Sequence, residues 1–293
     1  MQKIFVKLLS PENPVLYFYY YRVKKYFNSL RFKGLKEPEN GWPILFGVSI
    51  PKSGTHLLSQ ILTGFSKVAP FATHEQYIGL GPTLDPQSRR WKMEKQLTKL
   101  RPLDVALSHM TTSQENLKSI YAPKFLPFFI MRDPRDIVVS LAHYTVNRKT
   151  HRLHEYFSDT LQSFDERLLA SIRGVRAEGN AARSIAKQIE SHIGWLEHKE
   201  MLYIRFEDLI ENRHASMGVI ANHLLQRVKT LPHSREEIVD ALESSINPQK
   251  SSTFRSGKTG EWKKYFTDEH RQVFKQVAGD LLIRLGYESS YDW

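Results

Sequence analysis

The architecture of the chain is read most directly from residues 42–65, WPILFGVSIPKSGTHLLSQILTGF. Residues 42–50 are apolar and rich in β-formers, and they end at Pro51, which predicts a buried strand. The apolar positions that follow have the spacing of one helix face and are Leu57, Leu58, Ile61, Leu62 and Phe65. The stretch therefore predicts a strand that enters a helix through a tight turn.

Further short apolar runs alternate with helical patterns along the chain. The strand-like runs are residues 104–108, 125–131 and 201–206, and helical composition covers 136–145, 156–173, 181–199, 212–226 and 268–285. Buried parallel strands tend to be short and apolar, and strands separated by helices favour a parallel sheet covered on both faces. We therefore expect an α/β fold, a three-layer α/β/α domain with a central parallel sheet.

The chain divides into an N-terminal helical, aromatic segment at residues 1–40, packed on or flanking the domain, and one domain at residues 41–293. Inside the domain, residues 69–90 and 247–260 are rich in turn formers. Long irregular segments in compact α/β domains are typical of substrate lids and ligand loops. We expect both segments to be irregular and close to a ligand.

Composition narrows the possible functions. The 293 residues are 41% apolar and 25% charged, as in a globular protein, and the absence of cysteine excludes disulfides and a cysteine nucleophile. The formal net charge of +11 favours an anionic ligand, a nucleic acid or an acidic membrane, and charge alone does not choose among them.

No stretch approaches the roughly 18 to 20 apolar residues that a transmembrane helix needs. Residues 14–23, PVLYFYYYRV, are followed by Lys24 and Lys25, and this order is wrong for a secretory signal. We therefore expect a cytoplasmic protein without a transmembrane span. The aromatic segment either docks its tyrosines on the domain, which we favour, or rests on a membrane surface in a peripheral contact.

The turn Pro51-Lys52-Ser53-Gly54-Thr55-His56 has the composition of an anion site. A strand that enters a helix through small residues presents backbone N–H groups and the positive end of the helix dipole to one point. Lys52 adds a charge there, and Ser53 and Thr55 add hydroxyl groups. The nucleotide-kinase pattern GxxxxGK[ST] is absent because the lysine precedes the glycine, which disfavours a Mg-ATP site. An ordinary helix cap is the alternative.

Two more basic elements follow. Arg132 directly follows the strand-like run 125–131, and Ser140 lies eight residues later, so that both are candidates to bind one phosphate. Arg135 and Asp136 are candidates for an ion pair at the helix start. The segment 254–262, FRSGKTGEW, combines two cations with two glycines, which let a loop approach an anion closely.

The segments PKSGTHLL, RDPRDIVVS, YIRFEDL and RSGKTGEW, in this order, resemble the sulfotransferase family that uses 3′-phosphoadenosine 5′-phosphosulfate, or PAPS. The resemblance covers about residues 43–285 and implies a cytosolic-type sulfotransferase domain with a P-loop-like phosphosulfate-binding turn. It implies that PAPS is the co-substrate and that no metal is required, because cations neutralise the charge that magnesium handles in kinases. The residues it implies at the 5′-phosphosulfate are Lys52, Ser53, Gly54, Thr55 and His56, and those at the 3′-phosphate are Arg132, Ser140, Arg255, Ser256 and Gly257.

Sulfuryl transfer to a hydroxyl group needs a general base, and histidine suits this task near neutral pH. His109 ends the strand-like run DVALSH and has the spacing of the family's catalytic histidine, so it is our candidate base. A strand-end histidine bonded to a carbonyl is the structural alternative. His56, His74 and the neighbouring Glu75 are rivals. Lys52 is the candidate that stabilises the leaving group.

The sequence departs from the family pattern at the adenine site. Leu57 stands where the family has a stacking tryptophan, and Phe206 stands where it has a tyrosine, so Phe254 is a candidate to supply an aromatic face. Ser256 replaces a lysine. A family dimer motif is half kept at Lys263 and Thr267, which predicts a monomer or weak dimer.

We expect the acceptor to be the hydroxyl or amine group of a small organic molecule, and the sequence does not identify that molecule. We expect residues 69–100, 143–165 and 240–253 to wall its pocket, and no nucleic-acid partner. Two other functions compete with the sulfotransferase interpretation. A P-loop nucleotide kinase or NTPase would need magnesium, and a non-catalytic protein binding nucleic acid or a membrane surface would show steeply salt-dependent affinity.

Overall fold

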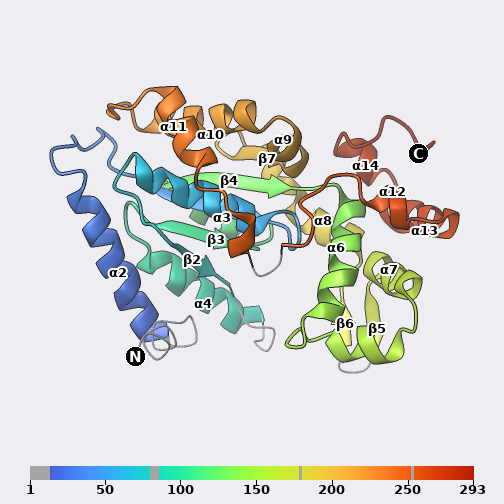
Figure 1. The fold of residues 1–293 in the computed structure, drawn as a ribbon. Helices are drawn as coiled ribbons and strands as arrows, with labels where there is room; N and C mark the ends of the chain where they lie inside the picture. The colour runs from blue at the N-terminus through green and yellow to red at the C-terminus, as the bar shows by residue number, and fades with distance from the viewer. Residues whose placement is uncertain (1–13, 80–85, 178–179, 252–253) are drawn as a thin grey trace.

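The computed structural model describes residues 14–79, 86–177, 180–251 and 254–293, without the side chains at 14–18, 86–91, 177 and 180. Its centre is a five-stranded sheet in the order β2-β3-β1-β4-β7, in which every neighbouring pair is parallel (Figure 1). The strands are β1 (Ile44–Ser49), β2 (Glu75–Ile78), β3 (Val105–Ser108), β4 (Phe125–Met131) and β7 (Leu202–Arg205). A small antiparallel hairpin, β5 (Val175–Ala177) and β6 (Asn180–Ala182), lies outside the sheet.

Helices connect and cover these strands. They are α2 (Pro14–Leu30), α3 (Thr55–Gly64), α4 (Pro86–Lys99), α5 (Gln114–Ile120), α6 (Pro134–Asn147), α7 (Phe164–Arg173), α8 (Ile185–Ile193), α9 (Phe206–Glu211), α10 (Arg213–Arg227), α11 (Arg235–Glu243), α12 (Trp262–Tyr265), α13 (Asp268–Ala278) and α14 (Leu281–Arg284). Short 3-10 turns are η1 (Phe65–Lys67), η3 (Gly194–Glu197) and η4 (Pro248–Lys250), and η2 (Tyr156–Thr160) is a π-helix.

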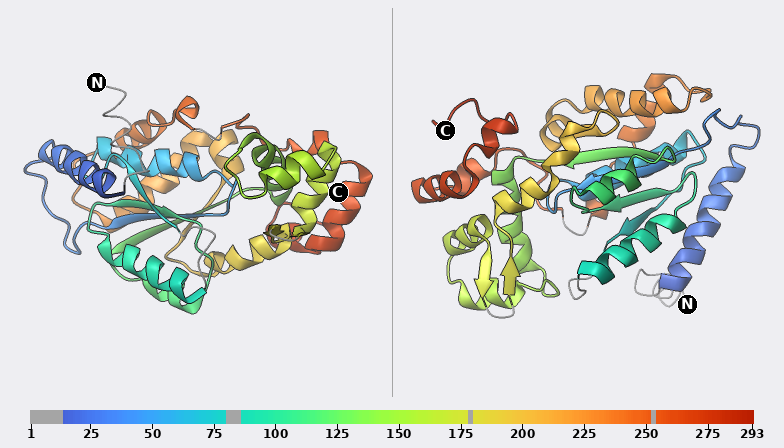
Figure 2. Two further views of the ribbon diagram at one scale, coloured as in Figure 1. Left: turned by 90° about the horizontal axis from the view of Figure 1, so that it is seen from below. Right: turned by 180° about the vertical axis from the view of Figure 1, so that it is seen from behind.

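The sheet buries a separate apolar cluster on each face. On β4, Leu126, Phe128 and Ile130 pack with residues of α3, α10 and α11, whereas Phe129 and Met131 pack on the other side with α6, α7, α8 and α13. This period of two is what a strand buried on both faces requires. Figure 2 shows the helices on both sides of the sheet from two further directions. The three-layer α/β/α fold is thus confirmed.

Two segments differ from the sequence expectation. The segment 69–90 holds β2 and the start of α4, because Glu75–Ile78 joins the edge of the sheet beside β3. The segment 156–173 is not one helix, because Ser163 forms a capping box with Glu166 and starts α7 anew. The pattern S-x-x-E is a known helix-start signal, so this second boundary was readable from the sequence.

The N-terminal helix α2 packs on the domain through one face. Tyr21 is 2% exposed, Asn28 donates to the carbonyl of Phe71 at 2.8 Å, and Lys25 pairs with the buried Asp104. Residues 1–13 lie outside the described residues, and the division of the chain at residue 40 stays a prediction. Within the part of the chain that the structure describes, no helix is both long and apolar enough to cross a bilayer.

Candidate active site

The predicted site elements meet at the carboxyl edge of the sheet. The turn after β1, His109 after β3, Arg132 after β4 and Phe206 after β7 line one cavity of about 460 Å³. This is where open α/β sheets bind their ligands. The lining also includes the remaining sequence candidates Gly54, Thr55, His56, Ser140, Phe254, Arg255, Ser256 and Gly257. Ser53 and the rival base His74 are the sequence candidates outside the lining.

The turn after β1 has the left-handed backbone that an anion-binding loop needs. Lys52 has φ 73° and Gly54 has φ 108°, and Gly54 is the N-cap of α3. A Cβ atom at Gly54 would lie 2.8 Å from the Phe206 ring and 3.0 Å from the Ile130 side chain. Glycine is therefore required here by both conformation and space, and the amino end of α3 faces the cavity.

Ser53 holds the turn together instead of facing the cavity. Its hydroxyl group lies 2.7 Å from the carbonyl oxygen of Ile50 and 3.1 Å from that of Ile130, and its amide donates to Ile50 as well. The side chain is fully buried. Ser53 thus ties the turn to β4, and its hydroxyl is already committed to protein carbonyls.

Lys52 is a partly buried cation among other cations. Burial, and after it the charges of Arg132 and Arg255, together lower the pKa of its ammonium group to about 8. The ammonium nitrogen lies 3.8 Å from the centre of the Tyr144 ring, within cation–π range. An anion bound between these three cations would relieve their mutual repulsion.

Arg132 is held between the loop and the sheet. Its guanidinium donates to the Lys258 carbonyl oxygen at 2.7 Å, lies 3.3 Å from an Asp136 carboxylate oxygen, and stacks over the Phe206 ring at 4.6 Å. Its Nε atom is buried and finds no acceptor among the described residues. A buried guanidinium N–H on a cavity wall without an acceptor fits an anionic ligand there.

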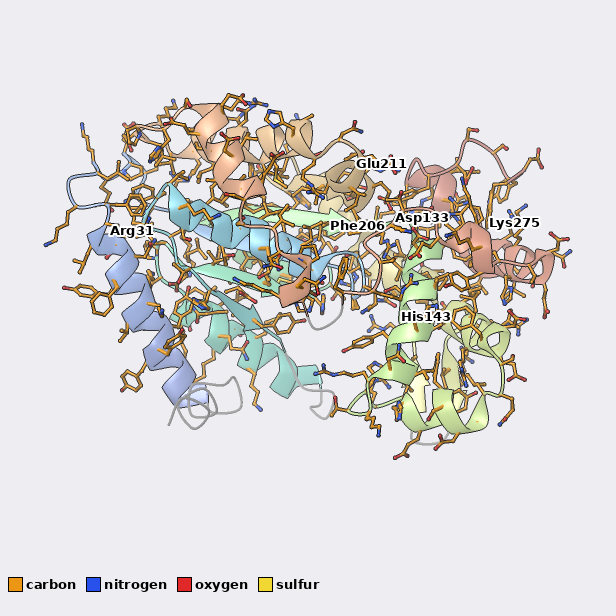
Figure 3. The ribbon with its side chains drawn as sticks, in the orientation of Figure 1. Arg31, Asp133, His143, Phe206, Glu211 and Lys275 are labelled. Carbon is orange, nitrogen blue, oxygen red and sulfur yellow. The ribbon has the colours of Figure 1, made fainter. Side chains whose placement is uncertain are left out.

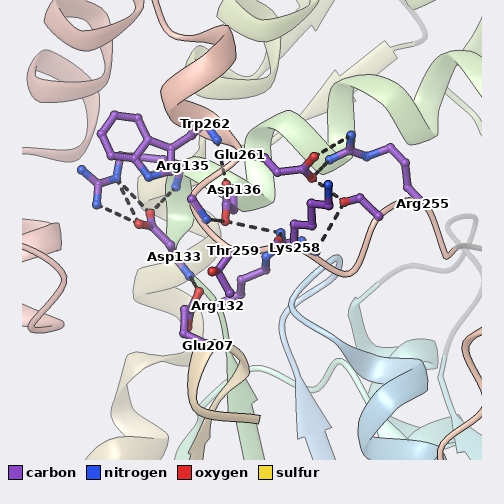
Figure 4. Close-up of polar contacts among 12 residues, drawn as sticks. Arg132, Asp133, Arg135, Asp136, Glu207, Arg255, Lys258, Thr259, Glu261 and Trp262 are labelled. Carbon is purple, nitrogen blue, oxygen red and sulfur yellow. Dashed lines mark hydrogen bonds and ion pairs between the residues drawn. The ribbon is translucent and has the colours of Figure 1, made fainter. Parts of the chain in front are cut away.

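Asp136 anchors the distant basic loop to the start of α6 (Figure 4). Its carboxylate accepts from the amides of Gly260 at 2.8 Å and Trp262 at 2.9 Å, in addition to Arg132. The expected pair of Arg135 with Asp136 does not form. Arg135 instead pairs with Asp133, because Asp136 is turned toward the loop amides.

Glu261 binds two other residues of the basic loop at 254–262 and so holds the loop in one conformation. Arg255 forms a salt bridge with Glu261, and the Ser256 hydroxyl group donates to the same carboxylate. Burial acts to raise the pKa of Glu261, but the Ser256 hydrogen bond and the Arg255 charge outweigh it, and the pKa lies below its usual range. Trp262 packs on Arg135, whose guanidinium lies 3.8 Å from the ring centre. Trp262 therefore supports the end of the loop by packing against Arg135.

His109 is held in one orientation by Ser49. The Nδ1 atom lies 2.7 Å from the Ser49 carbonyl oxygen and 3.1 Å from the Ser49 hydroxyl, which in turn lies 2.9 Å from the Thr55 hydroxyl. A carbonyl oxygen only accepts, so Nδ1 carries the proton and Nε2 is the basic nitrogen. Burial lowers the pKa of His109 to about 4, and the imidazole is neutral at pH 7.

Of the alternative candidate bases, two line the cavity and one does not. His56 and Glu75 line the cavity, and His56 is exposed. His74 does not line it, since its Nδ1 atom lies 2.9 Å from the Thr73 hydroxyl and its ring packs against Tyr20. Within the described residues, His109 is the one histidine of the three with a hydrogen bond to β1, beside the turn at residues 51–56.

The expected acceptor segments contribute to the cavity wall through Glu75, Tyr77, Tyr144, Ile246, Pro248 and Ser251. The sequence reading missed Gln60, Leu107, Ile210 and Arg213, which also line it. Gln60 exchanges two hydrogen bonds of 2.8 Å with the backbone of Asn247 and fixes the 246–251 segment to α3. No local sequence signal marks these residues, because their place depends on the tertiary fold.

The parallel sheet and the cationic cavity at its edge define an α/β protein with a site suited to an anionic ligand. The family model described as a sulfotransferase domain matches residues 44–286, and the chain therefore belongs to the sulfotransferase family. The family expectation from the sequence is confirmed, and the protein is a sulfotransferase. Neither a nucleotide kinase nor a non-catalytic basic protein is favoured.

Two curated sulfotransferases and one solved structure match the chain at low identity. An amine sulfotransferase of Oryctolagus cuniculus is 23% identical over 255 residues, which are 80% of this chain and 78% of the relative. A 3-alpha-hydroxysteroid sulfotransferase of Cavia porcellus is 25% identical over 181 residues, 55% of this chain and 57% of the relative. The crystal structure of a mouse sulfotransferase complexed with PAP matches with a TM-score of 0.58 and 17% identity, covering 84% of this chain and 86% of that one.

Proposed function

We propose that this sulfotransferase moves the sulfuryl group from PAPS to a hydroxyl or amine group of a small organic acceptor, which releases adenosine 3′,5′-bisphosphate, or PAP. The observation that carries the proposal is the meeting of Lys52, Arg132 and Arg255 on one cavity. PAPS bears anionic groups at both ends of its ribose, and three cations from distant segments match that distribution.

The arrangement of the strands orients the donor. The 5′-phosphosulfate belongs at the turn after β1, with Lys52, the amides of Gly54 and Thr55 and the exposed His56 around it. The 3′-phosphate belongs beside Arg132 and Ser140 after β4, with Arg255, Ser256 and Gly257 of the loop closing over it. The adenine then lies toward Phe206 and Phe254, the aromatic side chains on this part of the wall.

The transfer is an in-line displacement at sulfur. The acceptor oxygen or nitrogen attacks sulfur, its proton passes to Nε2 of His109, and the bond from sulfur to the bridging oxygen breaks. The electron pair stays on the 5′-phosphate of PAP, where the Lys52 ammonium and the helix amides stabilise the growing negative charge. Positioning and electrostatics of fixed groups supply most of the acceleration, and the reaction needs no metal.

The acceptor side of the cavity lies toward β2. Glu75 and Tyr77 of β2, Tyr144 of α6 and Pro248 of η4 surround it. Their mix of aromatic and polar groups supports a small organic acceptor. We further propose the cytoplasm as the compartment. We propose a monomer or weak dimer as the assembly, because the dimer motif is only half kept and its Thr267 serves as the N-cap of α13.

A binding experiment separates the donor classes. We expect PAP to raise the thermal unfolding temperature strongly, and ATP with magnesium or a short DNA duplex to have little effect. Stabilisation by ATP with magnesium or by DNA, without any by PAP, would overturn the proposed donor. Product formation from labelled PAPS with a panel of phenols, alcohols, sugars and amines, read by mass spectrometry, then identifies the acceptor.

A matched pair of arginine variants completes the test. Arg132→Met should weaken PAP binding by about tenfold or more, because it removes a charge-assisted contact to phosphate. Arg173→Met at the exposed end of α7 should leave PAP affinity unchanged. Equal PAP affinity of both variants would show that Arg132 does not hold the nucleotide.

A further inference from the structure

The helix α2 carries two stripes of side chains with the same spacing on opposite faces. Tyr21, Lys25 and Asn28, at i, i+4 and i+7, face the domain. Tyr19, Val23, Tyr26 and Phe27, at i, i+4, i+7 and i+8, have exposed fractions of 64%, 50%, 61% and 61%. Two residues along an α-helix correspond to a turn of about 200°, so the second stripe points away from the domain.

This exposed stripe is unusual for the molecule. Among the described residues, the exposed large apolar side chains are Tyr19, Val23, Tyr26, Phe27, Tyr77, Val219, Phe254 and Tyr291. Four of the eight belong to this one helix face, while Tyr77 and Phe254 line the cavity. A contiguous apolar face of this kind marks a surface that is covered by a partner.

The charges around the stripe identify the partner. Residues 14–36 contain Arg22, Lys24, Lys25, Arg31, Lys33 and Lys36 and no acidic residue, and the exposed Glu37 and Glu39 follow them. Lys25 is paired with Asp104, whereas Lys24, Arg31, Lys33 and Lys36 are exposed. Arg31 lies at the carboxyl end of α2, where the helix follows the outer edge of the molecule (Figure 3).

We propose that α2 binds the surface of an anionic lipid bilayer, with Tyr19, Val23, Tyr26 and Phe27 inserted at the headgroup boundary. Aromatic side chains suit that boundary because their rings are apolar and the tyrosine hydroxyl groups stay hydrated. The exposed cations Lys24, on α2, and Arg31, directly after it, match the negative surface of such a bilayer. The face that docks on the domain keeps the helix in place.

The proposed membrane surface shares no residue with the proposed nucleotide site. Tyr20 contacts His74 at a ring distance of 5.7 Å, and the next residue, Glu75, lines the acceptor side of the cavity. Bilayer contact through α2 therefore brings the β2 edge near the membrane without using a residue of the nucleotide site. Loss of membrane binding and loss of PAP binding are consequently separate outcomes.

Vesicle sedimentation tests the proposal with the full chain. We expect the protein to bind vesicles of phosphatidylcholine with phosphatidylserine, to bind phosphatidylcholine alone much less, and to be released by added salt. Equal binding to both vesicle types, or no binding to either, would overturn the proposal. This arm needs no variant.

A pair of double variants locates the surface. Tyr26→Ser with Phe27→Ser should reduce binding to the anionic vesicles roughly tenfold or more, because burial of two aromatic rings is lost. Val219→Ser with Tyr291→Ser, which changes exposed apolar side chains elsewhere, should bind as the natural chain does. Stabilisation by PAP should be the same in all three proteins.

A second copy of the chain is the competing occupant of this face. Light scattering of the natural chain and the Tyr26→Ser, Phe27→Ser variant measures the mass of each in solution. A monomer in both supports the membrane surface. A dimer that the variant dissociates, with unchanged binding to vesicles, would overturn the proposal.

Discussion

The Nδ1 atom of His109 lies 2.7 Å from the carbonyl oxygen of Ser49, the last residue of β1. The turn at residues 51–56 begins two residues after Ser49, so one strand end fixes both the proposed base and the proposed donor site. This bond also decides which imidazole nitrogen is free to take a proton. The first prediction tests that role.

Replacement of His109 by Ala should lower kcat by about 10²- to 10⁴-fold, because a positioned general base is lost. PAP affinity, measured by calorimetry, should change little, since the imidazole serves the acceptor and not the nucleotide. His214→Ala on the exposed surface of α10 is the control and should retain full activity. A His56→Ala variant that loses activity while His109→Ala keeps it would transfer the role to His56.

The pH dependence of kcat/KM should be bell-shaped. Below the pKa of His109, about 4, the imidazole is protonated and accepts no proton from the acceptor. Above the pKa of Lys52, about 8, the ammonium is lost and no longer stabilises the leaving group. Activity should therefore fall on the acid side near pH 4 and on the alkaline side near pH 8.

The alkaline limb can be assigned with one variant. Lys52→Arg keeps its charge to far higher pH, so the fall in kcat/KM near pH 8 should disappear even where the absolute rate is reduced. Lys52→Ala should cost about 10²-fold or more in turnover. An alkaline limb that persists unchanged in Lys52→Arg would assign it to another group.

Gly54→Ala should destabilise the fold and weaken PAP binding. The substitution places a methyl group against Phe206 and Ile130 and forces alanine into φ 108°, with a cost of about 1–3 kcal/mol for the crowding in addition to the backbone strain. Gly34→Ala is the matched control, because φ is also positive there, at 93°, but a Cβ atom would meet no atom of a non-neighbouring residue within 4 Å. Denaturant unfolding of both proteins measures the difference, and equal losses would show that Phe206 and Ile130 move aside.

Asp136→Asn should loosen the basic loop. The change removes the charge that balances Arg132 and weakens the bonds from the Gly260 and Trp262 amides, so we expect a loss of about 3 kcal/mol or more in stability. PAP affinity should fall with it, because Arg255 belongs to the same loop. Asp240→Asn on the exposed face of α11 serves as the control. Unchanged PAP affinity in Asp136→Asn would show that the loop holds its place by other contacts.

Much of the fold was readable from the sequence because its signals are local. The strand at 44–49 and the helix at 55–64 follow from the periodicity of a single stretch, and strand 125–131 was located to the residue. The edge strand 75–78 was missed, because EQYI is short and half polar and becomes a strand only through its pairing with β3.

The sequence predicted which residues form the site better than it predicted the contacts that hold them in place. The motifs named Lys52, Arg132 and Arg255, and the fold brings them to one cavity. The sequence could not show that Asp136 ties Gly260 and Trp262 into place, because 124 and 126 residues separate these partners. Nor could the sequence show that the Ser53 hydroxyl is bonded to backbone carbonyls. A serine in a turn looks the same in the sequence whether its side chain faces a ligand or the core.

The strand order β2-β3-β1-β4-β7 separates the two ends of the cavity. The proposed donor contacts Lys52 and Arg132 follow β1, the central strand, and its neighbour β4, whereas Glu75 and Tyr77 stand on β2 at the edge of the sheet. An outermost strand tolerates substitution more readily than an interior one. New acceptor preferences can therefore evolve at the periphery of the sheet, while the grip on the donor is left intact.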